Sequence, residues 1–271
     1  MQSLSGIPIL GLGTYGRRED AGVEAMSKAI EIGYRHIDTA QTYDTEANVG
    51  EAVRRSGLPR ENFFITTKVA NFNLSRDLFR PSVEKSVETI GLGPVDLLLI
   101  HWPSHKDEVP FEHYIKALAE AQQRGLARLI GVSNFTIAHL NRAVSLLGPG
   151  AIATNQVEIH PYLQAPKLCA HARQLGIVQT AYQPLAQGRV SHDPVFEKIA
   201  ARHGVAASAA ALAFLMAEGH IVIPASSNEG HLRDNFRATE VNLSAEEMSE
   251  IRTLERGLRV INPSMSPVWD D

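Results

Sequence analysis

Apolar runs of β type alternate with segments of helical period along almost the whole chain. The runs are rich in Ile, Val, Leu and Thr, as expected of strands that are covered on both faces. Strands are predicted at residues 8–14, 34–40, 63–69, 95–102, 127–134, 154–160, 177–185 and 221–226. Helical periodicity is clear at residues 21–33, 48–57, 78–93, 111–125 and 196–219, and several of these segments end at a glycine.

This alternation predicts an α/β protein with a parallel sheet, and eight such units in 271 residues predict a (β/α)8 TIM barrel. No linker, low-complexity tract or change of composition divides the chain, so we expect one domain over residues 1–271. Ser244 followed by Glu247 is a capping-box pattern and predicts an extra C-terminal helix. The tail from Ile261 has no regular period and is expected to be a loop.

Charge and composition limit the kinds of binding partner that the protein is expected to have. The net charge is −4, and no run of Lys and Arg points to nucleic acid or to an anionic membrane. The longest apolar segment, residues 209–217, is far shorter than the roughly 20 residues of a membrane span, and no signal peptide is evident. A single cysteine, Cys169, fits a reducing compartment. We expect a cytoplasmic protein, a monomer, whose partner is a small molecule.

The stretch GLGTYG at residues 11–16 matches a dinucleotide-binding fingerprint, and Asp38 ends the next predicted strand, as a ribose-binding acid does in a Rossmann fold. In that fold the glycines open a helix directly. Here the helical period begins only near Asp20, and Pro8 interrupts the preceding strand. The stretch is therefore interpreted as a strand end and a loop.

Three neighbouring predicted strands each end in an ionisable residue on the inward-facing parity: Asp38, Lys68 and His101. In a barrel this parity directs them to one cavity at the C-terminal ends of the strands. Alone, each has an ordinary interpretation as a helix cap, a solvated strand end or a loop histidine. Together they are consistent with a buried ion pair, because pairing with Asp38 offsets the free-energy cost of burying the charge of Lys68.

Tyr43 follows Asp38 by five residues and is expected to lie beside the Lys68 cation. A phenol near a positive charge ionises more readily than its unperturbed pKa of about 10 suggests. Tyr43 is therefore a candidate general acid.

Two other chemistries were weighed. A Schiff-base lyase with Lys68 as the nucleophile needs a deprotonated amine, whereas Asp38 favours the charged form. A metal-dependent hydrolase would recruit His36, Asp38, His101 and His160, but their spacing contains no tight ligand pair, and we expect no metal.

These residues lie in motifs that resemble the aldo-keto reductase family over nearly the whole chain. The motifs are residues 33–53 (GYRHIDTAQTYDTEANVGEAV), 65–68 (ITTK), 97–103 (LLLIHWP), 131–135 (GVSNF), 155–163 (NQVEIHPYL), 181–188 (AYQPLAQG) and 222–227 (VIPASS). The segments IATNQ, PYLQ, NFTI and HWPS and the pair Trp269-Asp270 further resemble the bacterial branch that contains 2,5-diketo-D-gluconate reductase B and methylglyoxal reductase.

The resemblance implies a barrel that binds an extended nicotinamide cofactor and reduces small aldehydes, 2-oxoaldehydes or keto sugars. By position, the catalytic residues are Asp38, Tyr43, Lys68 and His101. Tyr43 is implied to donate the proton, Lys68 held by Asp38 to tune it, and His101 to orient the carbonyl oxygen. A nicotinamide-binding redox-sensing or interaction subunit remains the alternative from outside catalysis.

The resemblance also implies cofactor contacts. Ser133, Asn134 and Gln156 are expected to bind the carboxamide, and Tyr182 to stack on the nicotinamide ring. A helix N-cap is an equally good interpretation of Ser133 and Asn134 taken alone. The other candidate cofactor-binding residues are Thr14, Leu185, Gly188, Ser226, Asn228, Arg233 and Asn235.

The chain departs from the family pattern at both ends of the expected site. Ala225 and His231 replace basic residues that hold the 2′-phosphate of NADP in many members, so Arg233 or Arg237 is expected to supply the charge, with NADP(H) preferred and NAD(H) possible. Many relatives have a tryptophan where this chain has Ala70 and Asn71, which predicts a wider substrate pocket. The candidate substrate-binding residues are Tyr15, Phe72, His101, Trp102 and Trp269.

Overall fold

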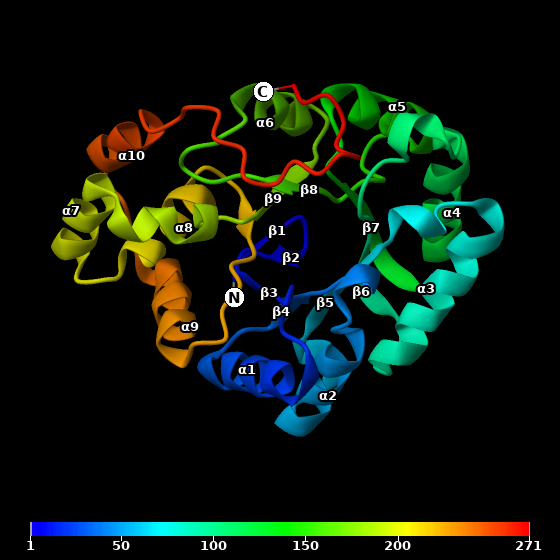
Figure 1. Cartoon of the computed structure of the whole chain (residues 1–271), viewed down its shortest axis with the longest axis horizontal. Coiled ribbons are helices and arrows are strands. Elements are labelled where there is room, and N and C mark those ends of the chain that lie inside the picture. Colours follow the sequence, from blue (N-terminus) through cyan, green and yellow to red (C-terminus); the bar gives the residue numbers. More distant parts are fainter. Residues whose placement is uncertain (1, 271) are drawn as a thin grey trace.

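A closed ring of eight parallel strands forms the centre of the computed structural model, which describes residues 2–270 (Figure 1). The strands are β3 (Gly11–Gly13), β4 (His36–Asp38), β5 (Phe64–Val69), β6 (Val95–Ile100), β7 (Ala127–Ser133), β8 (Thr154–Glu158), β9 (Val178–Tyr182) and β10 (Ile221–Val222). They pair in chain order, and a parallel bridge between Leu10 and Val222 joins the first to the last. The predicted TIM barrel is confirmed, and each strand is shorter than its predicted range. Most of them end early because their last predicted residues belong to the loops of the barrel mouth, whereas β5 ends as predicted, at Val69.

Helices surround the ring (Figure 1). They are α1 (Glu19–Ile32), α2 (Glu46–Ser56), α3 (Arg76–Ile90), α4 (Phe111–Gln123), α5 (Ile137–Leu147), α6 (Pro166–Gln174), α7 (Pro194–His203), α8 (Ala207–Ala217), α9 (Glu229–Phe236) and α10 (Ala245–Arg252). The segment predicted as one helix over residues 196–219 is two helices that meet at 92°. The reason is Gly204, which ends α7 at a φ of 62°, in the left-handed region.

The first residues form a hairpin that sequence reasoning missed. β1 (Ser3–Leu4) and β2 (Ile7–Pro8) pair antiparallel around Ser5 and Gly6, both of which have positive φ. Ile7 packs inside the barrel with Phe64, Leu97, Leu99 and Ile221. Residues 7 and 8, placed at or next to the first barrel strand by the prediction, therefore belong to a separate element at one end of the barrel.

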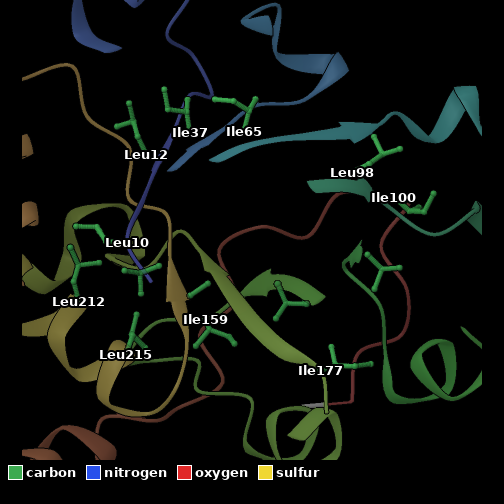
Figure 2. Packing of buried hydrophobic residues seen from close by; sticks show 14 of the residues in the cluster. Leu10, Leu12, Ile37, Ile65, Leu98, Ile100, Ile159, Ile177, Leu212 and Leu215 are labelled. Carbon is green, nitrogen blue, oxygen red and sulfur yellow. The ribbon is translucent and has the colours of Figure 1, made fainter. Parts of the chain in front are cut away.

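The other parity of the strands faces the helices. Figure 2 shows Leu12, Ile37 and Ile65 side by side on neighbouring strands, in the large core that lies between the barrel and its helical layer. Since Ile37 points outward, His36 and Asp38 on either side of it point inward. The parity that the sequence assigned to Asp38 and its partners is thereby confirmed.

The end of the chain agrees with its prediction. Ser244 and Glu247 form the capping box of α10, and residues 255–270 contain no helix or strand. Within residues 2–270 no single helix is long and apolar enough to cross a membrane, and only the sharply bent pair of α7 and α8 reaches that length and composition together.

Candidate active site

A buried ion pair lies where β4 and β5 end. The ammonium of Lys68 pairs with Oδ1 of Asp38 and donates to the carbonyl oxygen of Thr39 at 2.9 Å. The second oxygen of Asp38 accepts a hydrogen bond of 2.7 Å from Nε2 of Gln156. The side chains of Lys68 and Asp38 are 0% and 2% exposed. The predicted pair is confirmed, and Gln156 completes the partners of its carboxylate.

This environment keeps Lys68 charged. Burial by itself would lower the pKa of the ammonium, but the charge of Asp38 and the hydroxyl of Tyr43 outweigh it and raise the pKa above its usual value. A permanently protonated amine is a poor nucleophile, which argues against the Schiff-base alternative.

Tyr43 ends the short 3-10 turn at Gln41–Tyr43 that follows β4. Its hydroxyl lies 3.5 Å from Nζ of Lys68, and the ammonium is 4.8 Å from the ring centroid. Burial raises the pKa of the phenol, and Lys68 only partly offsets that effect. The prediction of a lowered pKa was therefore wrong in its net direction, because desolvation of the ring outweighs the cation. The phenol is thus held as a neutral proton donor.

His101 stands directly after β6, where its backbone N–H donates to Val69 at 3.0 Å. Its Nδ1 is 3.4 Å from the hydroxyl of Thr42, and its Nε2 faces Tyr43. Burial and the Lys68 charge lower the pKa of the imidazole to about 3. His101 is therefore neutral at physiological pH.

A cavity of about 730 Å³ opens at this end of the barrel, and Asp38, Tyr43 and His101 line it. Lys68 lies behind them. Nine predicted cofactor-binding residues also line the cavity: Thr14, Ser133, Asn134, Gln156, Tyr182, Leu185, Gly188, Ser226 and Asn235. One concave surface thus brings together residues from the ends of five strands, β3, β4, β7, β8 and β9, and from the loops that follow these and other strands.

Hydrogen bonds fix the polar residues that end β7 and β9. Asn134, at a φ of 62°, donates from Nδ2 to the carbonyl oxygen of His101 at 2.9 Å and accepts from the hydroxyl of Tyr182 at 2.8 Å. Ser133 donates to the carbonyl oxygen of Gln156 at 2.7 Å. Neither residue caps α5, because its N-cap is Thr136. The N-cap interpretation of Ser133 and Asn134 was wrong.

The residues expected to carry charge at the far end of the cavity do not line it. Asn228 accepts from the backbone of His231 as the N-cap of α9, and Arg233 forms an exposed ion pair of 2.8 Å with Glu229. Arg237 donates to the carbonyl oxygen of Gly204. Each is held by a nearer partner on the surface, so these predictions are corrected.

Arg17 lines the cavity without having been predicted. It is the only Lys or Arg among the described residues that line the cavity, and it comes from the loop between β3 and α1. Its Nε is buried and has no hydrogen-bond partner, and burial lowers its pKa. The adjacent residues Arg17 and Arg18 indicated a positive charge near the glycine stretch, but the sequence pattern does not show which of the two faces the cavity.

The substrate end is also only partly as predicted. Tyr15 and Trp102 line the cavity, and Tyr15 meets Tyr43 edge to face at 5.2 Å. Trp269 does not line the cavity, but its ring centroid lies 6.2 Å from that of Trp102. Phe72 is outside it and 67% exposed, on the short turn at Asn71–Asn73.

Ala70 does not line the cavity, since it is fully buried and its N–H donates to Gln41 at 2.8 Å. Thr42, Ile261 and Pro263 line the cavity without having been predicted. All three lie outside the strands and α-helices, where periodicity gives no signal.

The residues of the metal alternative do not form a ligand set. His36 contacts Thr66 and the backbone of Pro8, and His160 contacts Glu158. Across residues 2–270 no three side chains of His, Cys, Asp or Glu are grouped so as to hold a metal ion.

Comparison with known proteins agrees with this geometry. A model of the Aldo/keto reductase family matches residues 9–256. The chain is 44% identical to methylglyoxal reductase DkgB of Escherichia coli O157:H7 over 97% of its own length and 99% of that protein. It superposes on a crystal structure provisionally identified as 2,5-diketo-D-gluconic acid reductase B with a TM-score of 0.92 and 41% identity, covering 98% of this chain and 95% of that one.

A second solved structure is the Bombyx mori aldo-keto reductase in complex with NADP. It matches with a TM-score of 0.88 and 33% identity, over 95% of this chain and 92% of that one. The chain therefore belongs to the aldo-keto reductase family and is an oxidoreductase that acts on carbonyl groups.

Proposed function

We propose that this protein reduces small aldehydes, 2-oxoaldehydes or keto sugars to alcohols with NADPH, and that Tyr43 donates the proton. The observation that carries the proposal is the position of the Tyr43 hydroxyl, within 3.5 Å of both Lys68 and His101 on the wall of a large cavity. The relatives named as methylglyoxal reductases support the substrate class.

The residues around the cavity fit an extended dinucleotide. Oδ1 of Asn235 lines the cavity, is buried and has no partner, so it is free to accept from the amino group of an adenine. At the loop after β9, Gln183, Ala186, Gln187 and Gly188 all have positive φ. These conformations turn the backbone sharply beside the cavity, which Gln187 and Gly188 line. No atom lies within 4 Å of the Cβ position of Gly188, which leaves room for a phosphate.

Ser133, Asn134, Gln156 and Tyr182 would hold the nicotinamide end beside Tyr43. NADPH bound there would supply the hydride that the carbonyl carbon of the substrate needs. The O–H bond of Tyr43 breaks as its proton passes to the carbonyl oxygen, which completes the alcohol. Lys68 stabilises the phenolate that remains, since Asp38 keeps the lysine charged.

His101 positions the oxygen that is to be protonated. Its Nε2 faces the Tyr43 hydroxyl, and the hydroxyl of Thr42 is placed to donate to Nδ1. That arrangement favours the tautomer in which Nε2 carries the hydrogen, so a neutral His101 donates to the carbonyl oxygen. Because the imidazole is uncharged, it does not compete with Tyr43 as the acid.

The preference for NADPH rests on Arg17. With Arg233 and Arg237 held elsewhere, Arg17 is the lysine or arginine side chain that the described cavity wall offers to a phosphate. Ser226 adds a hydroxyl on the same wall.

The experiment is NADPH oxidation with methylglyoxal, small aldehydes and keto sugars, run beside Tyr43→Phe. We expect turnover by the wild type and a large loss in the variant. Wild-type inactivity across the panel, with NADPH bound, would favour a cofactor-sensing subunit. Equal activity in Tyr43→Phe would remove Tyr43 as the proton donor, and higher catalytic efficiency with NADH would reject the cofactor preference.

A further inference from the structure

The segment that follows α10 forms part of the cavity wall without being a regular element. Ile261 and Pro263 line the cavity, although residues 255–270 contain no helix or strand. Such a segment has few hydrogen bonds of its own, so its position depends on contacts with the barrel. We call residues 258–263 the tail wall.

One carboxylate of the barrel holds Val260 and Ile261 of the tail wall. Oε1 of Glu158 accepts from the backbone N–H of Val260 at 2.7 Å, and Oε2 accepts from that of Ile261 at 2.8 Å. Oε1 also lies 3.0 Å from Nε2 of His160. The side chains of Glu158 and His160 are 0% exposed. Both oxygens of a buried acid are thus engaged by consecutive amides more than 100 residues away in the chain.

Other anchors of the tail lie at the start of the tail wall, where the N–H of Leu258 donates to the carbonyl oxygen of Tyr162 at 3.0 Å, or outside it. Glu255 accepts from the backbone of Gln164 and of Gly257 before it, and Asp270 accepts from the backbone of Ile137 after it. A carboxylate that bonds two backbone amides in a dry site is a strong and directional contact. Glu158 therefore fixes the part of the tail that faces the cavity.

The same strand reaches the ion pair. Gln156 and Glu158 are two residues apart on β8, so their side chains share a face. Gln156 donates to Asp38, while Glu158 holds the tail wall. The end of β8 thus contacts both the Asp38–Lys68 ion pair and the tail wall.

We propose that Glu158 is a positioning residue that holds the tail wall against the barrel and thereby completes the part of the cavity wall that Ile261 and Pro263 form. It does not touch the reacting atoms. Its removal loosens residues 258–263 while leaving Asp38, Tyr43, Lys68 and His101 in place. The expected effect on substrate binding rests on the proposed function, but the effect on the tail does not.

The test uses Glu158→Gln, which keeps the size of the side chain and turns an amide donor toward one of the two N–H groups. The chain has two tryptophans, Trp102 and Trp269, and they contact each other, so their fluorescence reports directly on the tail. We expect a red-shifted emission and faster tryptic cleavage after Arg259. We expect KM for the carbonyl substrate to rise about tenfold, the effect of losing one charge-assisted hydrogen bond, with kcat and the Kd for NADPH nearly unchanged.

Glu247 provides a matched control. It is also a buried glutamate that bonds a backbone N–H, that of Ser244 at 2.9 Å, and a histidine, His203 at 3.0 Å, but it lies in α10 and not at the cavity. Glu247→Gln should lower the melting temperature while leaving the emission spectrum, the cleavage rate and KM unchanged.

A second variant, Val260→Pro, removes one of the two hydrogen bonds from the tail side and leaves every side chain of the barrel unchanged. It should reproduce the emission change of Glu158→Gln. Its cleavage after Arg259 is not compared, because trypsin does not cut an Arg–Pro bond. The proposal is overturned if Glu158→Gln keeps the wild-type emission and cleavage rate and Val260→Pro keeps the wild-type emission, or if Glu247→Gln gives the same changes. If emission and cleavage change and no carbonyl compound is turned over, the positioning role stands and the proposed function fails.

Discussion

The hydroxyl of Tyr43 lies 3.4 Å from Nε2 of His101, and the two rings meet edge to face at 78°. Both groups are neutral at physiological pH, since burial raises the pKa of the phenol and lowers that of the imidazole to about 3. The charged group in hydrogen-bond reach of the hydroxyl is the Lys68 ammonium. In this arrangement Tyr43 is placed to donate the proton, and His101, a different side chain, is placed to orient the carbonyl oxygen that accepts it.

Replacing Tyr43 with Phe should abolish the proton transfer with little effect on the fold. The phenyl ring keeps the edge-to-face contact with Tyr15, while the hydroxyl is lost. We expect kcat/KM for carbonyl reduction to fall by about 10²–10⁴, with the Kd for NADPH, measured by fluorescence titration, within about twofold of the wild type. Tyr34→Phe removes a buried hydroxyl that bonds Leu232 and is the control. A comparable loss of activity in that variant would contradict a specific role for Tyr43.

The barrel, its strand parity and the Asp38–Lys68 pair could be predicted from the sequence because period-2 patterning and register fix them. Arg17 and the tail wall could not. Their positions depend on loop conformations and on single contacts, such as that of Glu158 with Val260, which leave no periodic trace. The assignment of Arg233 failed for the same reason, since its ion pair with Glu229 is set by its place on α9.

Asp38→Asn should destabilise the protein by leaving a buried cation without its counter-charge. Breaking a buried pair from one side costs about 3–5 kcal/mol, and we expect a loss of this size in chemical denaturation. Lys68→Met in the same chain should recover part of it, because the uncompensated ammonium is then removed. If the two single losses simply add in the double variant, the two residues do not act as a pair.

The stability of the protein should fall as pH decreases from about 6.5. Burial lowers the pKa of His101 from 6.5 to about 3 and that of His220 to about 4. Between these values and 6.5 the unfolded chain binds protons that the folded chain does not, so the free energy of unfolding decreases as pH falls through this window. Denaturation midpoints measured from pH 8 to pH 4 check this. His220→Asn should flatten the profile, and an unchanged slope would contradict the shift for that histidine.

The acid side of the pH–rate profile should not report His101. Because the pKa of His101 lies near 3, its charge is constant over the working range of the enzyme, and kcat/KM should be flat from pH 5 to pH 8. The activity is expected to fall only at alkaline pH, as Tyr43 loses its proton. A limb with an apparent pKa near 6.5 that disappears in His101→Gln would show instead that the imidazole titrates during catalysis.

Arg17→Ala tests where the cofactor phosphates lie. Arg17 brings a positive charge to the cavity, and its buried Nε has no partner, so its loss should weaken NADPH binding about tenfold or more, the value of a hydrogen bond to a charged group. Comparison with NADH identifies the phosphate. An equal loss for both cofactors assigns Arg17 to the pyrophosphate, whereas a loss confined to NADPH assigns it to the 2′-phosphate and accounts for a preference for NADPH. Arg124→Ala removes one exposed charge from the end of α4 and should change neither Kd. Unchanged binding of both cofactors by Arg17→Ala would show that the charge of this cavity wall does not act on the cofactor, and the preference for NADPH would then lose its physical basis.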